Sequence, residues 1–189
     1  MAPASLSDYE RLAQDGLSKM AYAYYAGGAR DEITLKANRR AWDRLWLHYR
    51  VLVDVSRRTI HTKLLGRRAD SPILIAPSAF HGLAHPDGEC ATAQGAEAAQ
   101  TTYIVSTLSN RCIEDIAAAS CANLWFQLYV YRDRAITRDL VQRAEDAGCE
   151  AIVLTVDAAE IGTRERDNAL GFNLPKHLTM GNLHGTGKE

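Results

Sequence analysis

The second part of the chain alternates short apolar runs with longer helical patterns. The apolar runs cover residues 73–76, 103–106, 124–129 and 151–156, and the helical patterns cover 86–99, 113–119 and 135–147. Strands that are separated by a helix pair in parallel through right-handed crossovers. Runs without polar alternation are typical of strands buried on both faces. The chain is therefore predicted to form a parallel α/β sheet covered by helices.

The first part of the chain reads differently. Apolar residues recur at helical spacing through residues 5–28, and Gly27 with Gly28 then ends the pattern. A second helix is predicted over residues 31–42, an irregular or weakly extended stretch over 45–55, and a short strand over 59–65 followed by a turn. The predicted division is 1–70 for a helical segment with short strands covering a barrel, 71–175 for the βα units, and 176–189 for the start of a mobile active-site loop.

Four strands leave two architectures open. A (β/α)8 barrel needs eight strands and about 250 residues, whereas the chain has 189. An open parallel sheet would have two edges that need cover. The chain is either a small doubly wound domain or half of a barrel.

Composition excludes several classes of protein. The net charge of −1 gives no electrostatic footprint for nucleic acid, and no apolar run approaches the ~20 residues of a membrane span. The four cysteines form no C-x-x-C pair, which favours reduced thiols and a cytoplasmic location. His81 and His85 have a metal-ligand spacing, but Gly82 and Pro86 interrupt a helix there, so no metal site is predicted.

The carboxyl ends of the four predicted strands carry polar side chains. They are Ser78 after the first strand, Ser106 and Thr107 after the second, Gln127 and Tyr129 in the third, and Thr155 and Asp157 in the fourth. Active sites of parallel α/β folds lie at this edge. Neutral donors and acceptors suit the polar edge of a planar heterocycle, since an amide can both donate and accept. The alternative is that these groups only cap loop backbone.

Five motifs carry a resemblance to a known family. They occupy residues 22–29 (YAYYAGGA), 75–79 (IAPSA), 84–89 (AHPDGE), 125–129 (WFQLY) and 154–157 (LTVD). In this order the motifs resemble the FMN-dependent 2-hydroxy-acid oxidase/dehydrogenase family, in its glycolate oxidase and L-lactate oxidase branch. The resemblance implies a TIM (β/α)8 barrel, of which this chain supplies the N-terminal helices and the first four βα units.

The resemblance also implies roles for individual residues. Pro77, Ser78 and Ala79 would lie along the flavin of FMN, and Ser106, Gln127, Tyr129 and Thr155 would complete the cofactor contacts. Tyr24, Tyr129 and Arg164 would surround the small 2-hydroxy acid, with Arg164 as a charge-assisted donor to its carboxylate. Tyr129 would hydrogen-bond the substrate oxygen that becomes a carbonyl.

The implied reaction oxidises a lactate- or glycolate-type L-2-hydroxy acid to the 2-oxo acid, and oxygen then yields hydrogen peroxide. Ala79 favours an oxidase, and Leu108 opens room for a substrate larger than glycolate. The histidine base is implied to lie in a second barrel half, on a separate chain or a missing segment, with a homotetramer when complete. The alternative is a non-catalytic half-barrel that binds a ligand or self-associates.

Overall fold

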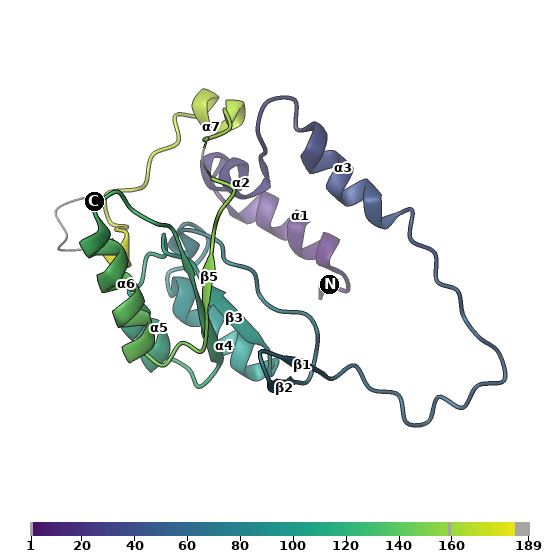
Figure 1. Ribbon diagram of the computed structural model, residues 1–189. Helices are drawn as coiled ribbons and strands as arrows, with labels where there is room; N and C mark the ends of the chain where they lie inside the picture. The colour runs from purple at the N-terminus through teal and green to yellow at the C-terminus, as the bar shows by residue number, and fades with distance from the viewer. Residues whose placement is uncertain (1, 159, 184–189) are drawn as a thin grey trace. The chain divides into compact units, whose positions relative to one another are not determined.

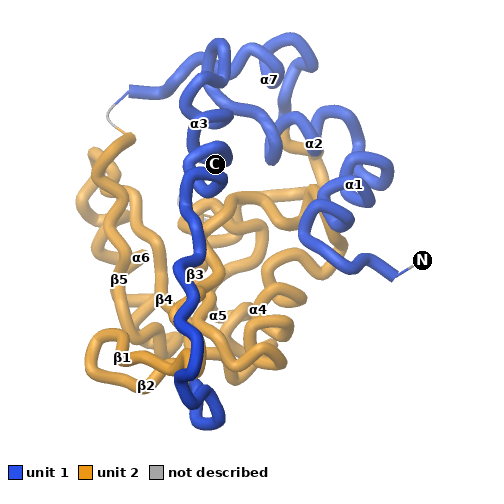
Figure 2. Tube along the Cα trace, turned by 90° about the vertical axis from the view of Figure 1, so that its right-hand side faces the viewer, with its two compact units in different colours: residues 1–58, 160–173 blue, residues 59–159, 174–189 orange. Residues whose placement is uncertain are grey.

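The computed structural model describes residues 2–158 and 160–183, which form two units (Figures 1 and 2). Unit 1 comprises Met1–Arg58 and Glu160–Asn173, and unit 2 comprises Thr59–Ala159 and Leu174–Glu189. Within the described residues, no helix has the length and apolar character that crossing a membrane requires.

The described residues of unit 1 form four helices: α1 (Leu6–Gly16), α2 (Lys19–Ala26), α3 (Ile33–Trp42) and α7 (Glu165–Ala169). The single helix predicted over residues 5–28 is wrong, because the chain becomes extended at Leu17 and Ser18. The Ser18 hydroxyl accepts a hydrogen bond from the Ala21 N–H at 3.2 Å and starts α2 anew. Serine favours this capping position over a helix interior because its side chain competes for backbone donors.

Few side chains are buried in unit 1. The buried apolar residues are Ala21 and Ala23, and α1 and α3 have none. An ion pair joins distant parts of the unit, because the exposed Arg166 donates through Nη2 to Oε2 of the buried Glu32 at 2.6 Å. Residues 45–55 form neither helix nor strand, in agreement with the prediction of an irregular stretch.

Unit 2 is built on a parallel sheet in the order β3 (Thr102–Val105), β4 (Asn123–Leu128), β5 (Ile152–Leu154). The helices α4 (Gly88–Ala98), α5 (Ile113–Ala118) and α6 (Arg134–Asp146) alternate with these strands along the chain (Figure 1). Asp133 caps α6 through its carboxylate, and Gly148 follows the helix with φ of +82°. The predicted alternation of parallel strands and helices is therefore confirmed.

The first predicted strand, 73–76, is reduced to one bridge between Ile75 and Tyr103. The Ile75 N–H donates to Thr102 at 2.9 Å, and its carbonyl accepts from Ile104 at 3.0 Å. Pro72 and Pro77 flank this bridge and lack the N–H groups that would extend the ladder. The first strand is thus shorter than predicted, although its position and parallel direction are as expected.

An antiparallel hairpin, β1 (Thr62–Leu64) and β2 (Arg67–Ala69), precedes the sheet. Leu65 and Gly66 both have positive φ, at 48° and 85°, which is the backbone of a type I′ turn. The predicted short strand and turn are confirmed in this region.

The hydrophobic core of unit 2 lies between the sheet and its helices. Tyr103, Val105 and Phe126 are fully buried on the helix-facing side of β3 and β4. Their partners on the helices are Ala93, Ala96, Ile113, Ile116, Ile136, Leu140 and Ala144. The 3-10 helices η1 (His81–Leu83) and η2 (Gly181–Leu183) complete the unit. Asn182 and Leu183 are buried within the segment predicted to begin a mobile loop at residue 176, and residues 184–189 lie outside the described part.

Candidate functional site

The carboxyl ends of β3, β4 and β5 share a hydrogen-bonded network centred on Gln127, which is 3% exposed. Gln127 Oε1 accepts from the Thr107 N–H at 3.1 Å and from the Ser106 hydroxyl at 3.4 Å. Gln127 Nε2 donates to the Thr155 hydroxyl at 2.7 Å. The structure therefore brings together three of the predicted cofactor residues, each from a different strand.

Two residues that the sequence did not single out for a role complete this network. The buried Thr107 hydroxyl donates to the Gln127 carbonyl at 2.6 Å and accepts from the Tyr129 N–H at 3.3 Å. Asn182 Nδ2 donates to the carbonyls of Ser106 and Thr107, and its Oδ1 accepts from the Ile113 N–H. Thr107 follows a strand, which was a usable signal, whereas Asn182 lies in a polar tail without any pattern.

Gly181 allows η2 to lie against the loop after β3. A Cβ at this position would stand 2.5 Å from the Arg111 carbonyl carbon and 2.6 Å from the Cys112 nitrogen. The Gly181 N–H also donates to the Ser109 carbonyl at 3.0 Å. The backbone of η2 can approach this closely only because residue 181 has no side chain.

Glu89 joins the loop after the first strand to the loop after β3. Its fully buried carboxyl group accepts from the N–H groups of His81, Asn110 and Arg111 at 3.0, 2.9 and 3.2 Å. Three backbone donors satisfy a group that would otherwise be costly to bury. Glu89 lay within a recognised motif, but its sequence position alone did not indicate this role.

Pro77 and Ser78 are exposed on the loop after the first strand, and Ala79 is half-buried. The loop is fixed just beyond them, because Phe80 adopts φ of +60° and its N–H donates to the Leu108 carbonyl at 3.1 Å. Unit 2 thus presents the backbone at residues 77–79 as an accessible surface next to a rigid anchor.

His81 anchors the same loop to α4. Its Nδ1 lies 2.9 Å from the Thr92 hydroxyl, and burial lowers the pKa of the imidazole, which Glu89 partly opposes. Among the residues that the structure describes, no three His, Cys, Asp or Glu side chains form a potential metal centre. Gly82 lies within η1 and Pro86 lies between η1 and α4, so His81 and His85 do not share one continuous helix.

Unit 1 holds Tyr24 and Arg164 together. The Arg164 guanidinium lies 5.1 Å from the centre of the Tyr24 ring, which stacks on Phe172 at 4.5 Å. Arg164 Nη2 donates to the carbonyls of Tyr24 and Gly27. A Cβ on Gly27 would lie 2.5 Å from the Ala23 carbonyl oxygen, so glycine allows this close turn. The two predicted substrate residues of this unit are thus in contact.

Asp167 is a further group beside Arg164 that the sequence did not assign. Its Oδ2 lies 2.7 Å from Arg164 Nε as an ion pair, although the N–H is not directed at the oxygen as in a hydrogen bond. Its buried Oδ1 has no hydrogen-bond partner among the described residues. Both side chains line a shallow pocket of about 600 Å³ with Phe172. The pocket offers a guanidinium to an anionic ligand next to a carboxylate that orients it.

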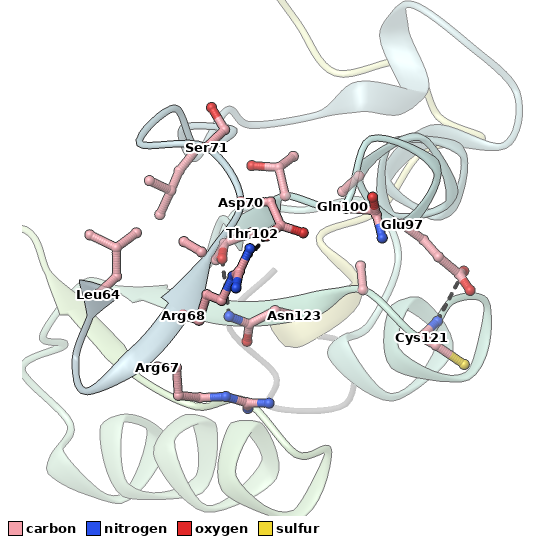
Figure 3. Close-up of a pocket in the computed structure, with 15 residues that line it drawn as sticks. Leu64, Arg67, Arg68, Asp70, Ser71, Glu97, Gln100, Thr102, Cys121 and Asn123 are labelled. Carbon is pink, nitrogen blue, oxygen red and sulfur yellow. Dashed lines mark hydrogen bonds and ion pairs between the residues drawn. The ribbon is translucent and has the colours of Figure 1, made fainter. Parts of the chain in front are cut away.

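Unit 2 has a pocket of about 250 Å³ at the amino-terminal ends of β3 and β4, away from the Gln127 network (Figure 3). Thr102 and Asn123 begin β3 and β4, and they line this pocket with Arg68 of the hairpin. Figure 3 shows the dashed hydrogen bond from Asn123 to Thr102 and the one between Cys121 and Glu97. Because parallel α/β folds place chemistry at the carboxyl ends of their strands, we assign the candidate site to the Gln127 network.

The network offers neutral donors and acceptors. Gln127 Nε2 has a second N–H beyond the one given to Thr155, and the Thr155 hydroxyl proton remains available for donation. Such groups fit the carbonyl and N–H edge of a planar heterocycle, and a fixed positive charge is not required there. This donor set therefore fits the flavin that the sequence resemblance implied.

Comparisons with known proteins show what this chain is similar to. The family described as FMN-dependent dehydrogenase matches residues 13–188. Glycolate oxidase 3 of Oryza sativa subsp. indica is 49% identical over 179 residues, covering 95% of this chain and 49% of that protein. L-lactate oxidase of Nostoc sp. is 48% identical over 186 residues, covering 96% of this chain and 51% of that protein.

Solved structures of mandelate oxidase share the fold. A mutant of that enzyme with (S)-mandelic acid superposes with a TM-score of 0.92 at 44% identity, covering 96% of this chain and 54% of that chain. Another mutant structure, with a C4a-OH-FMN adduct, gives a TM-score of 0.89 at 44% identity, covering 93% of this chain and 53% of that chain. The predicted TIM-barrel fold class is confirmed for this chain, which spans about half the length of the relatives it matches.

Proposed function

Because this chain belongs to the FMN-dependent dehydrogenase family, we propose that it carries one part of an active site that oxidises an L-2-hydroxy acid to the 2-oxo acid. The observation that carries the proposal is the buried Gln127 network at the carboxyl ends of three parallel strands. Its neutral polar groups stand where barrel enzymes bind cofactor and substrate.

The cofactor is FMN. Pro77, Ser78 and Ala79 present backbone along the flavin, while Ser106, Gln127 and Thr155 hydrogen-bond its polar edge and Tyr129 closes the same site. Bound FMN supplies a hydride acceptor, which protein side chains do not provide. The rigid attachment of this loop at Phe80 and of Gln127 at Thr107 supports the assignment, because a preorganised site loses little entropy on binding.

Tyr24, Tyr129 and Arg164 bind the substrate. The Arg164 guanidinium pairs with the substrate carboxylate, and Asp167 keeps that guanidinium in position. Tyr129 hydrogen-bonds the oxygen that becomes a carbonyl. The base that removes the hydroxyl proton is a histidine from the part of the barrel that this chain does not span.

We propose an oxidase that uses oxygen as the second substrate, so that the overall products are the 2-oxo acid and hydrogen peroxide. Ala79 beside the flavin supports oxygen access, and the half-buried Leu108 leaves room for a substrate of lactate size rather than glycolate size. The complete enzyme is a cytoplasmic homotetramer, in which thiols such as Cys121 stay reduced.

Flavin binding tests the proposal. The protein, purified with any polypeptide that accompanies it and supplied with FMN, should retain the visible absorbance of bound flavin after gel filtration. Gln127→Leu should lower flavin retention at least tenfold, while Gln142→Leu on the exposed face of α6 should not. Circular dichroism checks that both variants are folded. A flavin-free protein under these conditions would contradict the proposal and favour a non-catalytic half-barrel.

The role of Tyr129 has its own test in the complete enzyme. Tyr129→Phe removes one hydroxyl group and should lower kcat by about tenfold to a hundredfold while changing substrate KM little, because the hydrogen bond strengthens as the carbonyl forms. Steady-state kinetics with L-lactate measures both constants. An unchanged kcat would exclude this role for Tyr129.

A further inference from the structure

Two of the three guanidinium nitrogens of Arg164 are held by other groups of unit 1. Nη2 donates to the carbonyls of Tyr24 and Gly27 at the C-terminus of α2, and Nε lies 2.7 Å from the Asp167 carboxylate. Nη1 has no hydrogen-bond partner among the residues that the structure describes. A carboxylate ligand would therefore meet the N–H groups of Nη1, whose direction depends on how Nη2 and Nε are held.

The Gly27 carbonyl belongs to a turn that Glu32 fixes. The Glu32 residue is 7% exposed, and its Oε1 accepts from the Gly28 N–H at 3.1 Å. The backbone of Glu32 has φ of +57°, an uncommon conformation for a residue other than glycine. Such a conformation persists only where surrounding contacts compensate for its cost. The contacts of the Glu32 carboxylate are therefore specific to this turn.

The same turn is attached to the chain on both sides of Arg164. Glu32 Oε2 accepts from Arg166 Nη2 at 2.6 Å, and Arg166 lies in the first turn of α7. The Arg30 N–H donates to the carbonyl of Thr163, which directly precedes Arg164, at 2.9 Å. Figure 1 shows α7 beside α2 within unit 1. The Glu32 carboxylate thus connects the turn that accepts from Arg164 to the helix that begins at Arg164.

We propose that Glu32 is a positioning residue for substrate binding. It holds the Gly27–Gly28 turn against the start of α7, so that Arg164 keeps Nη1 directed at the ligand carboxylate. The inference rests on the proposed function, in which Arg164 binds that carboxylate. Because the charge of Glu32 is paired with Arg166, Glu32 supplies geometry to the site and leaves the charge of Arg164 unchanged.

The chain offers a matched pair of variants for a test. Glu32→Gln and Asp31→Asn each replace one carboxylate with an amide of the same size, at adjacent positions. Residue 32 is buried, whereas residue 31 is exposed. In Glu32→Gln one of two donors, the Gly28 N–H or Arg166, must face an NH2 group instead of an acceptor. Arg166→Gln is the second variant, since its side chain is 52% exposed and its replacement leaves the buried volume unchanged.

The first measurement uses the full 189-residue chain and needs no activity. NMR of the arginine Nε–H groups, assigned with Arg164→Leu, reports how firmly this guanidinium is held. Because Arg164 Nε is buried beside Asp167, its hydrogen should exchange slowly with water. Glu32→Gln and Arg166→Gln should each speed that exchange about tenfold, and Asp31→Asn should change it less than twofold. Fast exchange in the unaltered chain, or exchange that neither of the first two variants alters, would overturn the proposal.

The second measurement uses the complete enzyme and compares kcat/KM for L-lactate with kcat/KM for L-lactamide, which lacks the negative charge. The ratio of the two does not depend on the amount of folded, flavin-loaded protein, so a purely structural defect leaves it unchanged. Arg164→Leu should lower the acid-to-amide ratio about a hundredfold, and Glu32→Gln about tenfold. Asp31→Asn should change the ratio less than twofold.

The acid-to-amide ratio also separates this proposal from the proposed function. If Arg164→Leu leaves the ratio unchanged, the substrate role of Arg164 is wrong, and the positioning role of Glu32 falls with it. If Arg164→Leu lowers the ratio and Glu32→Gln does not, only the positioning role is overturned. An equal fall for Glu32→Gln and Asp31→Asn would also overturn it, because loss of any nearby charge would then explain the result.

Discussion

Gln127 is held at both ends of its side-chain amide by groups of neighbouring strands, Thr107 and Thr155. The sequence predicted that Gln127, Thr155 and Ser106 would meet, because each ends a parallel strand and such ends share one edge of the sheet. It could not predict the contribution of Asn182. This residue lies some seventy positions from its partners, and no periodic pattern marks a side chain that turns inward from a loop.

Glu89 gives a prediction at the scale of the residue. Glu89→Gln places an NH2 group where three backbone N–H groups now converge, so donors lose their acceptor in a buried place. The free energy of unfolding should fall by about 2 kcal/mol, measured by urea denaturation. Glu97→Gln, at an exposed position with one backbone donor, is the control and should cost less than half as much. Equal losses would show that burial at Glu89 is unimportant.

At the scale of the element, the sequence predicted which segments are strands and helices better than where they begin. Apolar patterns extend over several residues, but a single hydroxyl at Ser18 is enough to divide one predicted helix into two. The first strand is similarly limited by Pro72 and Pro77, which remove ladder donors without changing the apolar pattern between them.

Two glycines with open surroundings test the capping of helices. A Cβ on either Gly148 or Gly95 would meet nothing within 4 Å, so only backbone conformation distinguishes them. Gly148→Ala should destabilise the protein by about 1 kcal/mol, because φ of +82° suits glycine alone. Gly95→Ala, within α4, should stabilise it by about 0.5–1 kcal/mol. Thermal denaturation measures both, and changes of the same sign would contradict this reasoning.

The ion pair between α5 and α6 makes stability depend on pH. Two hydrogen bonds from Arg143 lower the pKa of Glu114 from 4.5 to about 2. The pair therefore stabilises the folded state above about pH 4.5, and this contribution is lost as pH falls towards 2.

Replacing Glu114 with glutamine tests this pair. Because the Glu114 side chain is 47% exposed, solvent screening limits its contribution to about 1 kcal/mol at neutral pH. Glu114→Gln should lose that amount at pH 7 and a smaller amount at pH 3, as seen in urea midpoints. Glu145→Gln on the exposed side of α6 is the control. If Glu114→Gln lost more stability at pH 3 than at pH 7, the assigned downward shift of the Glu114 pKa would be wrong.

At the scale of the whole molecule, apolar burial is unevenly distributed. The core cluster belongs entirely to unit 2, whereas α1 and α3 of unit 1 contain no buried residue. The sequence could not reveal this difference, because the helical pattern of residues 5–28 and 31–42 predicts an apolar face but not what covers it.

Hydrogen exchange should report this difference directly. Amides of α1 and α3 should exchange at least a hundredfold faster than those of β3 and β4, because local opening there exposes little apolar surface. Mass spectrometry of peptides after timed labelling gives both rates in one sample. Equal protection of both units in the isolated chain would contradict the predicted difference.

The close approach at Gly181 has a bearing on inheritance. Every amino-acid replacement that a single base change can produce in a glycine codon adds at least a Cβ atom. At residue 181 that atom would collide with the backbone of Arg111 and Cys112, which has no rotamer to change. Apart from silent changes, no single-base change in the codon for Gly181 should therefore be neutral, even though the position lies in a tail without any sequence pattern.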